Sequence, residues 1–340
     1  MTKNVTQQDI ASKLGVSQGL VGRVIAGDSA TRVSAETRKR ILDAASEMGY
    51  RPNLAALSMR QNRFYSIGVL AELPFIHPMA WQYVEGINKG LMDRGYTMSL
   101  IRLMDVDGGS GDGLSARAFQ GRTLDGLIGV VNVPAVLRSK IEKLVPHCVW
   151  LNTEIRLPER CIHRDEAAAG RLAIEKLHEG GYHKVIYLRG GLGGHYSHRA
   201  RLGAVQATAE KLGMAMNDTV IDSESGILET VVARTQPGSV VLVSDGYLVQ
   251  HLAIAALHQG RRPGIDFAVA CCDDGSGEWP GLSRVTFPRV AMGIAAAEMI
   301  VATTEQTGES PKSQLFCGEW VDGTTAPPPR GAHHPIRNWG

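Results

Sequence analysis

The chain has 340 residues, enough for two or three domains, and its 44% hydrophobic and 21% charged residues are typical of a soluble globular protein. The start of the chain is polar and lacks a signal-peptide pattern, and the longest apolar stretch, 290–302, is interrupted by Glu298 and too short to cross a bilayer. We therefore expect a cytoplasmic protein, in which the five scattered cysteines are reduced.

Positive charge is concentrated at the N-terminal end of the chain. Residues 1–63 contain 10 Lys and Arg against 5 Asp and Glu, a net charge of +5, whereas the remaining residues contain 26 against 29, a net charge of −3. A basic head on a mildly acidic body predicts that the head binds a polyanion.

Three short helices are predicted in the first fifty residues. Thr6 can cap the first helix, with Asp9 completing a capping box, and Ser17 and Ser34 can cap the second and third. The apolar stripes of the three helices are Ile10, Ala11 and Leu14, then Val21, Val24 and Ile25, then Ile41, Leu42, Ala45 and Met48. The first two helices, joined at Gly15, predict a helix-turn-helix, and the alternative is a generic three-helix bundle.

The motifs of this segment resemble a known DNA-binding headpiece. Residues 5–17 (VTQQDIASKLGVS), 21–24, 33–38 and 49–53 are similar to the headpiece of the LacI/GalR family of bacterial repressors. The resemblance implies that the second helix enters the major groove of operator DNA. It implies base contacts from Gln18, Gly19 and Arg23 and phosphate contacts from Thr6, Ser17 and Asn53.

The second helix departs from the family pattern at its glycines. Residues 20–23 are Leu-Val-Gly-Arg where the family usually has Thr-Val-Ser-Arg. Gly19 has no side chain with which to contact a base, and Gly22 lacks a hydroxyl for phosphate. Two glycines in one helix cost about 1 kcal/mol each relative to alanine. We therefore expect a helix that is loose off DNA and depends on Gln18 and Arg23 for contacts.

A hinge is predicted at residues 52–63. Residues 53–59 can form two helical turns, too few to be stable alone. The resemblance implies that this hinge folds on DNA, pairs with its dimer mate and inserts Met59 into the minor groove as an apolar wedge. The alternative is a plain linker that contains a methionine.

Strand and helix patterns alternate from residue 64 to the C-terminus. Strands are predicted at 66–71, 97–103, 126–131, 148–151, 184–188, 239–243 and 267–271, and helices at 81–94, 167–178, 201–212 and 248–258. Alternation of this kind predicts parallel sheets with helices on both faces, and two such sets predict two lobes. The expected organisation is an all-α helix-turn-helix headpiece (1–51), a hinge (52–63) and a two-lobed α/β domain (64–340).

The body also resembles the LacI/GalR family, whose effector-binding domain is similar to periplasmic sugar-binding proteins. The resemblance implies three crossings of the chain between the lobes, near 152–161, 285–289 and 319–322. Two positions depart from the pattern, since Ala204 replaces a usual glycine and Asp322 a usual arginine.

The resemblance also implies a ligand site between the lobes, at the carboxyl ends of the strands. Arg201, just ahead of a predicted helix, aligns with a ligand-clamping arginine, and Asp273 with a carboxylate that accepts hydrogen bonds from the ligand. Ser244 and Asp245 hold the position of an Asn-Asp pair. Phe75 and His77 are candidates to stack on or bond a sugar. For each, the alternative is an ordinary surface residue near a strand end.

Other classes of function are weakly supported. Gly191 and Gly193 follow a strand as in a dinucleotide-binding loop, but the third glycine of that pattern would fall at Tyr196. His195 and His198 lack the carboxylate or cysteine that would complete a familiar metal site. A transport-type binding protein would have a similar body, but it would not need the headpiece.

The sequence thus predicts a DNA-binding regulator, with no catalytic residues, metal or cofactor. We expect a homodimer on a roughly palindromic operator, with affinity set by a small molecule between the lobes. Relief of repression by an inducer is the default, although a corepressor would produce the same motifs. A saccharide is the expected effector, with a nucleobase or another metabolite left open. The alternative is a small-molecule-binding protein or sugar-active enzyme without sequence-specific DNA binding.

Overall fold

The structure is a computed structural model that describes residues 5–28, 30–51, 58, 63–71, 78–103, 119, 121, 123–190, 195–221, 226–273, 279, 281–306 and 311–328. The chain divides into two compact units, Met1–Phe64, here called the headpiece, and Tyr65–Gly340, the body. Four predicted site residues lie outside the described residues: Asn53, Met59, Phe75 and His77. No helix of the described ranges is long and apolar enough to cross a membrane.

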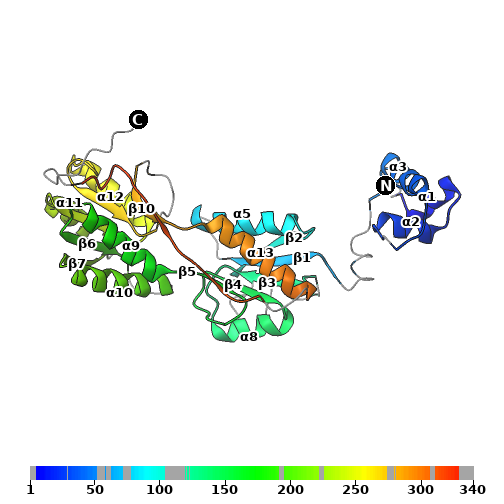
Figure 1. Cartoon of the computed structure of the whole chain (residues 1–340), viewed down its shortest axis with the longest axis horizontal. Helices are drawn as coiled ribbons and strands as arrows, with labels where there is room; N and C mark the ends of the chain where they lie inside the picture. Colours follow the sequence, from blue (N-terminus) through cyan, green and yellow to red (C-terminus); the bar gives the residue numbers. More distant parts are fainter. Residues whose placement is uncertain are drawn as a thin grey trace. The chain divides into compact units, whose positions relative to one another are not determined.

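The headpiece contains the three predicted helices, α1 (Gln7–Leu14), α2 (Gln18–Ile25) and α3 (Ala35–Glu47) (Figure 1). Thr6, Ser17 and Ser34 cap them as predicted. The core of the headpiece consists of Ile10, Ala11, Val21, Val24, Ile41 and Ala44. The prediction that Leu42 belongs to the core stripe is wrong, because that side chain is 47% exposed and Ala44, three residues after Ile41, takes the inward position.

The first lobe of the body is built on a parallel sheet. In the part of the chain that the structure describes, six strands pair in the order β11-β5-β4-β3-β1-β2. They are β1 (Ser66–Ala71), β2 (Thr97–Arg102), β3 (Gly126–Gly129), β4 (Cys148–Leu151), β5 (Cys161–Arg164) and β11 (Gln314–Phe316). Every residue of β3, β4 and β5 is buried, because helices cover both faces of the sheet.

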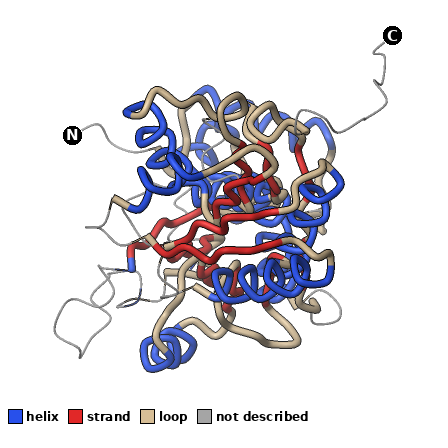
Figure 2. The backbone as a smooth tube through the Cα atoms, turned by 90° about the vertical axis from the view of Figure 1, so that its left-hand side faces the viewer, coloured by secondary structure: helices blue, strands red, loops and turns tan. Residues whose placement is uncertain are grey.

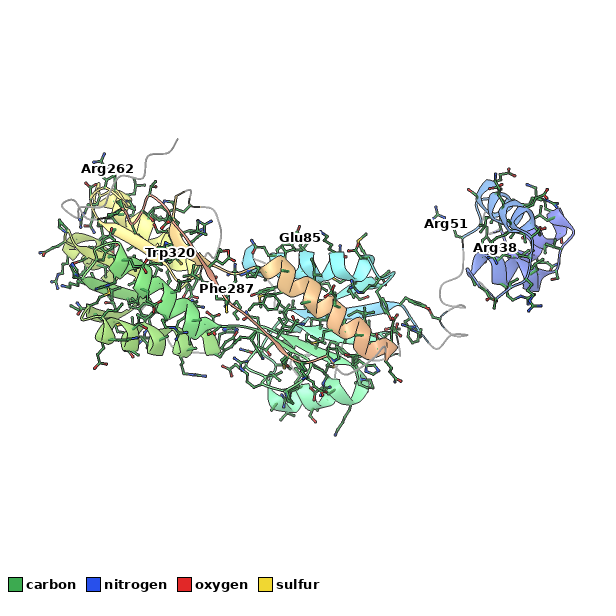
Figure 3. The ribbon with its side chains drawn as sticks, in the orientation of Figure 1. Arg38, Arg51, Glu85, Arg262, Phe287 and Trp320 are labelled. Atoms are coloured by element: carbon green, nitrogen blue, oxygen red, sulfur yellow. The ribbon has the colours of Figure 1, made fainter. Side chains whose placement is uncertain are left out.

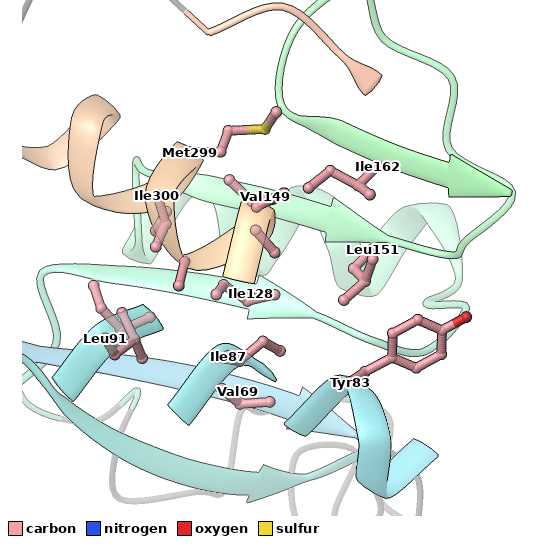
Figure 4. Packing of buried hydrophobic residues seen from close by; sticks show 14 of the residues in the cluster. Val69, Tyr83, Ile87, Leu91, Ile128, Val149, Leu151, Ile162, Met299 and Ile300 are labelled. Atoms are coloured by element: carbon pink, nitrogen blue, oxygen red, sulfur yellow. The ribbon is translucent and has the colours of Figure 1, made fainter. Parts of the chain in front are cut away.

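The helices of the first lobe divide between the two faces of its sheet. On one face lie α5 (Pro78–Met92) and α13 (Arg289–Glu305), and on the other lies α8 (Ala135–Leu144). Figure 4 shows Ile87 of α5 and Ile300 of α13 in the cluster that packs on β3 and β4. A Cβ atom on Gly86 of α5 would lie 2.1 Å from the carbonyl oxygen of Val290, so the close approach of the two helices requires glycine there.

The second lobe repeats this three-layer plan. Its described strands pair in the order β12-β10-β9-β8-β6-β7, all parallel except the edge pair β10 and β12. They are β6 (Lys184–Arg189), β7 (Ala215–Val220), β8 (Ser239–Val243), β9 (Ala268–Cys271), β10 (Ser283–Thr286) and β12 (Glu319–Val321). One face is covered by α9 (Glu166–Glu179) and α10 (Tyr196–Lys211), the other by α11 (Ile227–Arg234) and α12 (Gly246–His258). Figure 2 shows the strands in the interior with helices around them.

The chain passes between the two lobes at three places within the described residues. The first passage joins β5 to α9, the second joins β10 to α13, with Phe287 in the connection (Figure 3), and the third joins β11 to β12. The expectation of a first crossing at 152–161 is wrong, because that segment connects β4 to β5 within one sheet. The third passage falls at 317–318, just before the expected 319–322.

Candidate functional site

The N-terminal part of α2 presents a polar surface. Val21 and Val24 pack into the headpiece core, so Gln18, Gly19 and Arg23 lie on the exposed side of the helix. A Cβ atom on Gly19 would lie 3.6 Å from Nη1 of Arg23, one turn later. The guanidinium therefore lies along the helix beside Gly19, at ordinary contact distance from the position that a Cβ atom would take.

The second glycine of α2 is a packing position. Gly22 is half-buried, and a Cβ atom there would lie 3.0 Å from Oε1 of Gln7 in α1. A side chain at this position would require the end of the Gln7 side chain to move slightly, so Gly22 lies in contact with the first helix.

Thr6 and Ser17 differ in how their hydroxyl groups are occupied. The Thr6 hydroxyl donates to Oδ2 of Asp9 at 2.7 Å and accepts from the Asp9 amide at 3.2 Å. The Ser17 hydroxyl accepts from the amide of Leu20 at 3.2 Å, which leaves its own hydrogen to be donated. Of these two predicted phosphate contacts, which with Asn53 make up the predicted three, Ser17 can donate its hydroxyl hydrogen without breaking its cap.

Six buried charged side chains meet where the two lobes join, and we call them the charge cluster. Each of the six is at most 8% exposed. Two lie at or just after the ends of strands β5 and β9, and the other four lie at the starts of α9, α12 and α13 and in the first turns of α10. The six residues are Arg164, Glu166, Arg201, Asp245, Asp273 and Arg289. The sequence predicted Arg201, Asp245 and Asp273. Arg201 lies within α10, not ahead of the helix as expected.

Asp273 connects the two lobes through ion pairs. Nη1 of Arg164, at the end of β5 in the first lobe, donates to Oδ2 of Asp273 at 2.7 Å. Arg289, the first residue of α13, donates to the other oxygen, Oδ1. Nη2 of Arg201 lies 3.7 Å from Oδ2. One carboxylate of the second lobe is thus shared by two arginines of the first lobe and one of its own.

Arg201 is the centre of the second-lobe side of the cluster. Its Nη1 donates to Oδ1 of Asp245 at 3.1 Å and to the backbone carbonyl of Ser244. Its Nε lies 2.8 Å from Oε2 of Glu166, whose other oxygen lies 2.5 Å from Nη2 of Arg164. The Glu166 contacts are ion pairs without well-aligned hydrogen bonds. The Ser244 hydroxyl donates to Asp245 at 2.6 Å, so this predicted pair supports Arg201.

The cluster keeps its members ionised. Burial alone would raise the pKa of Asp273, but the three arginines, Arg164 foremost, hold that pKa far below its usual value. Burial likewise opposes the charge of Arg201, but the neighbouring carboxylates, Glu166 foremost, raise the pKa of Arg201 well above its usual value. The charges are therefore retained in a buried site because each has an opposite partner.

Two buried tyrosine hydroxyls beside the cluster have no hydrogen-bond partner among the described residues: those of Tyr83 and Tyr187. Tyr83, on α5, is 3% exposed, and burial raises its pKa while nearby Arg164 lowers it. Figure 4 shows its hydroxyl directed beyond the carboxyl end of β3, away from the hydrophobic cluster. An unsatisfied buried hydroxyl is costly, so its place near four charges of the cluster (Arg164, Arg289, Asp273 and Glu166) marks this position for a ligand or ordered water.

A second set of contacts between the lobes surrounds the start of α10. His195 Nε2 lies 2.9 Å from the carbonyl oxygen of Asn152, and the Tyr196 hydroxyl donates to Oδ1 of Asn152 at 3.0 Å. The guanidinium of Arg156 lies over the Tyr196 ring, 4.3 Å from its centroid. Burial lowers the pKa of His195 to about 4, so the ring is neutral at pH 7. In the described ranges no three His, Cys, Asp or Glu residues are arranged to hold a metal.

Sequence reasoning missed Arg164, Glu166, Arg289 and Tyr83. One signal was available for Arg289, since an arginine at the first position of a strongly apolar helix opposes the helix dipole and needs a carboxylate nearby. The others are ordinary residues of strands and helices whose proximity depends on the passages between the lobes.

Comparison with known proteins agrees with both units. Residues 6–53 match the family described as bacterial regulatory proteins, lacI family, and residues 174–326 match the periplasmic binding protein-like domain. The chain belongs to the LacI family of transcriptional regulators. It is a DNA-binding regulator with an effector-binding domain, and the family is not one of enzymes.

Individual relatives match nearly the whole chain of this LacI-family regulator. The HTH-type transcriptional regulator PtxS of Pseudomonas putida is 23% identical over 96% of this chain and 97% of its own. The lac repressor dimer bound to operator and the anti-inducer ONPF has a TM-score of 0.76 and 20% identity, with coverage of 96% and 100%. The CelR–cellobiose complex has a TM-score of 0.63 and 20% identity over 95% and 100%. At these identities the solved structures share the fold.

Proposed function

We propose that this regulator is a homodimeric, sequence-specific repressor whose operator affinity is set by a saccharide bound between the two lobes. The observation that carries the proposal is the charge cluster, in which side chains of both lobes meet at the carboxyl ends of both sheets. Ligands of parallel α/β sheets bind at these ends. A ligand seated there changes contacts between lobes and can thereby change their relative orientation.

The exposed face of α2 supplies the base contacts in this proposal. Arg23 can donate both arms of its guanidinium to one guanine, and Gln18 can pair with adenine. Ser17 donates to phosphate. The two solved relatives, one on operator and one with cellobiose, support the pairing of a DNA partner with a sugar effector.

The homodimer is supported by apolar side chains on the exterior of the second lobe. On α12, Ile254 is 54% and Leu257 76% exposed, and Ile265 nearby in sequence is 62% exposed. Burying them against a second copy would give a dimer with two headpieces, one for each half of a palindrome. Sedimentation of the Ile254→Asp/Leu257→Asp variant should give a monomer, with Glu179→Ala as the control, and an intact dimer would place the interface elsewhere.

The test of the whole proposal is a binding-site selection on random duplex DNA with the purified full-length protein, repeated with a panel of sugars. We expect a palindromic site whose affinity one of the sugars changes. Arg23→Ala should then cost about 1–3 kcal/mol on that site and relax specificity at one base pair.

Arg23→Lys provides the matched control for base contact. Lysine keeps the charge but loses the planar fork. If Arg23→Lys binds every sequence as well as the native protein does and Arg23→Ala weakens binding to every sequence equally, Arg23 contacts phosphate and does not read a base. Failure to enrich any site would contradict sequence-specific binding.

A further inference from the structure

The charge cluster is neutral as a whole but divided between the lobes. Arg164 and Arg289 belong to the first lobe, because β5 ends at the former and α13 begins at the latter. Glu166, Arg201 and Asp245, with Asp273, belong to the second lobe. Within the cluster the first lobe therefore presents two positive charges, and the second lobe presents an excess of two negative charges.

This division limits what can be inserted between the lobes. A ligand that enters here separates Asp273 from Arg164 or Arg289, which are 5% and 1% exposed. Arg164 keeps its ion pair with Glu166, but either guanidinium that loses the Asp273 carboxylate loses a buried anionic partner, and hydroxyl oxygens of a neutral ligand compensate for that loss only in part. The replacement that preserves the pairing is another carboxylate, which can accept from a guanidinium through two parallel hydrogen bonds.

The second-lobe side needs the opposite kind of group. Carboxylates such as Asp245 and Asp273 only accept hydrogen bonds, so a ligand must offer them donors, as hydroxyl groups do. The unpartnered Tyr83 hydroxyl, on the first-lobe side, adds one more donor for an anionic end.

We propose that the effector is a hydroxylated carboxylic acid, a sugar acid, with its carboxylate on Arg164 and Arg289 and its hydroxyls toward Asp273 and Asp245. This inference rests on the proposed function, in which a saccharide binds between the lobes. It makes Arg164 and Arg289 the residues that distinguish an acid from the neutral sugar of the same shape.

Matched ligand pairs test the inference directly. Calorimetric titration of the full-length protein would compare glucuronate with glucose, galacturonate with galactose, and gluconate with glucitol, since each pair differs at one carboxylate. We expect at least one acid to bind about 10-fold or more tightly than its neutral partner. That ratio should fall toward one in Arg289→Gln and in Arg164→Gln, through a loss of about 10- to 100-fold in acid affinity alone.

Two further variants keep the test decisive. Arg289→Lys retains the charge for the case in which Arg289→Gln does not fold, and it should show an intermediate ratio. Arg199→Gln removes an arginine that pairs across the lobes with Glu154 at 3.4 Å but is 63% exposed, and it should leave the ratio unchanged.

Three results would overturn the inference: a neutral sugar that binds as tightly as its acid, a ratio unaffected by both arginine substitutions, or no acid bound by a protein that still selects an operator. The first two results concern ligand affinity alone and the third includes operator selection, so none of them contradicts the regulator proposal. Loss of operator selection with acid binding preserved would contradict the regulator proposal instead.

Discussion

The headpiece and the body hold their candidate functional side chains in place by different kinds of contact. In the headpiece, Gln18 and Arg23 are positioned by local features: a cap at Ser17, two buried valines in the same helix and a core of six small and branched side chains. In the body, Arg164 contacts Asp273, 109 residues away. The helix that presents Gln18 and Arg23 is therefore specified by short-range sequence, whereas the charge cluster depends on how distant segments of the chain are brought together.

Removal of the shared carboxylate should have the largest effect. Asp273→Ala leaves three buried arginines with two carboxylates, and breaking a buried pair costs about 3–5 kcal/mol. Calorimetry should show the transition of the body moving to lower temperature while that of the headpiece stays in place. Glu179→Ala, which removes an exposed partner of Lys176, is the control and should leave both transitions unchanged. A small effect at Asp273 would mean that the charge cluster is looser than its contacts indicate.

The converse experiment damages the headpiece alone. Ile41 is 1% exposed, so Ile41→Ala should cost about 2–5 kcal/mol through lost burial and a cavity. Operator binding should fall while the transition of the body and its ligand affinity are retained. Leu42→Ala, at the neighbouring exposed position, should have little effect, and equal losses at the two positions would contradict the described orientation of α3.

Acidification from pH 7 toward pH 4 should reduce the stability of the body through a histidine that the headpiece lacks. Residues 1–64 contain no histidine, whereas His195 has a pKa lowered from 6.5 to about 4 by burial. Between these values the unfolded state binds the proton more readily, so the body should have full stability above pH 6.5 and lose it as the pH falls toward 4. His195 accounts for at most about 3 kcal/mol of this loss.

Denaturant titrations at pH 7 and pH 5 would measure this loss for each unit, and His195→Gln should reduce the loss in the body. A body whose stability does not change across this interval would show that His195 is not buried in the neutral form.

The smallest expected effect is at the first helix cap. Thr6→Ala removes the capping box with Asp9 and should destabilise the headpiece by about 1 kcal/mol. Thr6→Ser retains the hydroxyl and should recover most of the loss in a thermal melt. If Thr6→Ala weakens operator binding without changing the melt, the hydroxyl contacts phosphate and is more than a cap.

These differences also explain what the sequence could predict. All three headpiece helices and their caps were predictable because each cap depends on residues three positions apart. In the body, strands such as β1, β4 and β8 were confirmed at their predicted bounds, because buried parallel strands are continuous apolar runs. The partners of Asp273 were not predictable, because no local pattern indicates which arginines the passages between lobes will bring to it.

The position of α13 has a consequence for the order in which the protein forms. The first lobe begins at β1, yet the helix that completes one face of its core is residues 289–305, and that helix packs against α5 more than two hundred residues earlier. On the ribosome, the apolar face formed by α5 and the first sheet must remain uncovered until almost the whole chain has emerged. When α13 emerges, the sheet of the second lobe lacks only its edge strand β12, so the second lobe can fold before the first lobe. The headpiece can fold before both lobes. We therefore expect nascent chains to depend on chaperones while the first lobe is incomplete. We also expect a chain truncated after residue 288 to fold its headpiece but not its effector-binding domain.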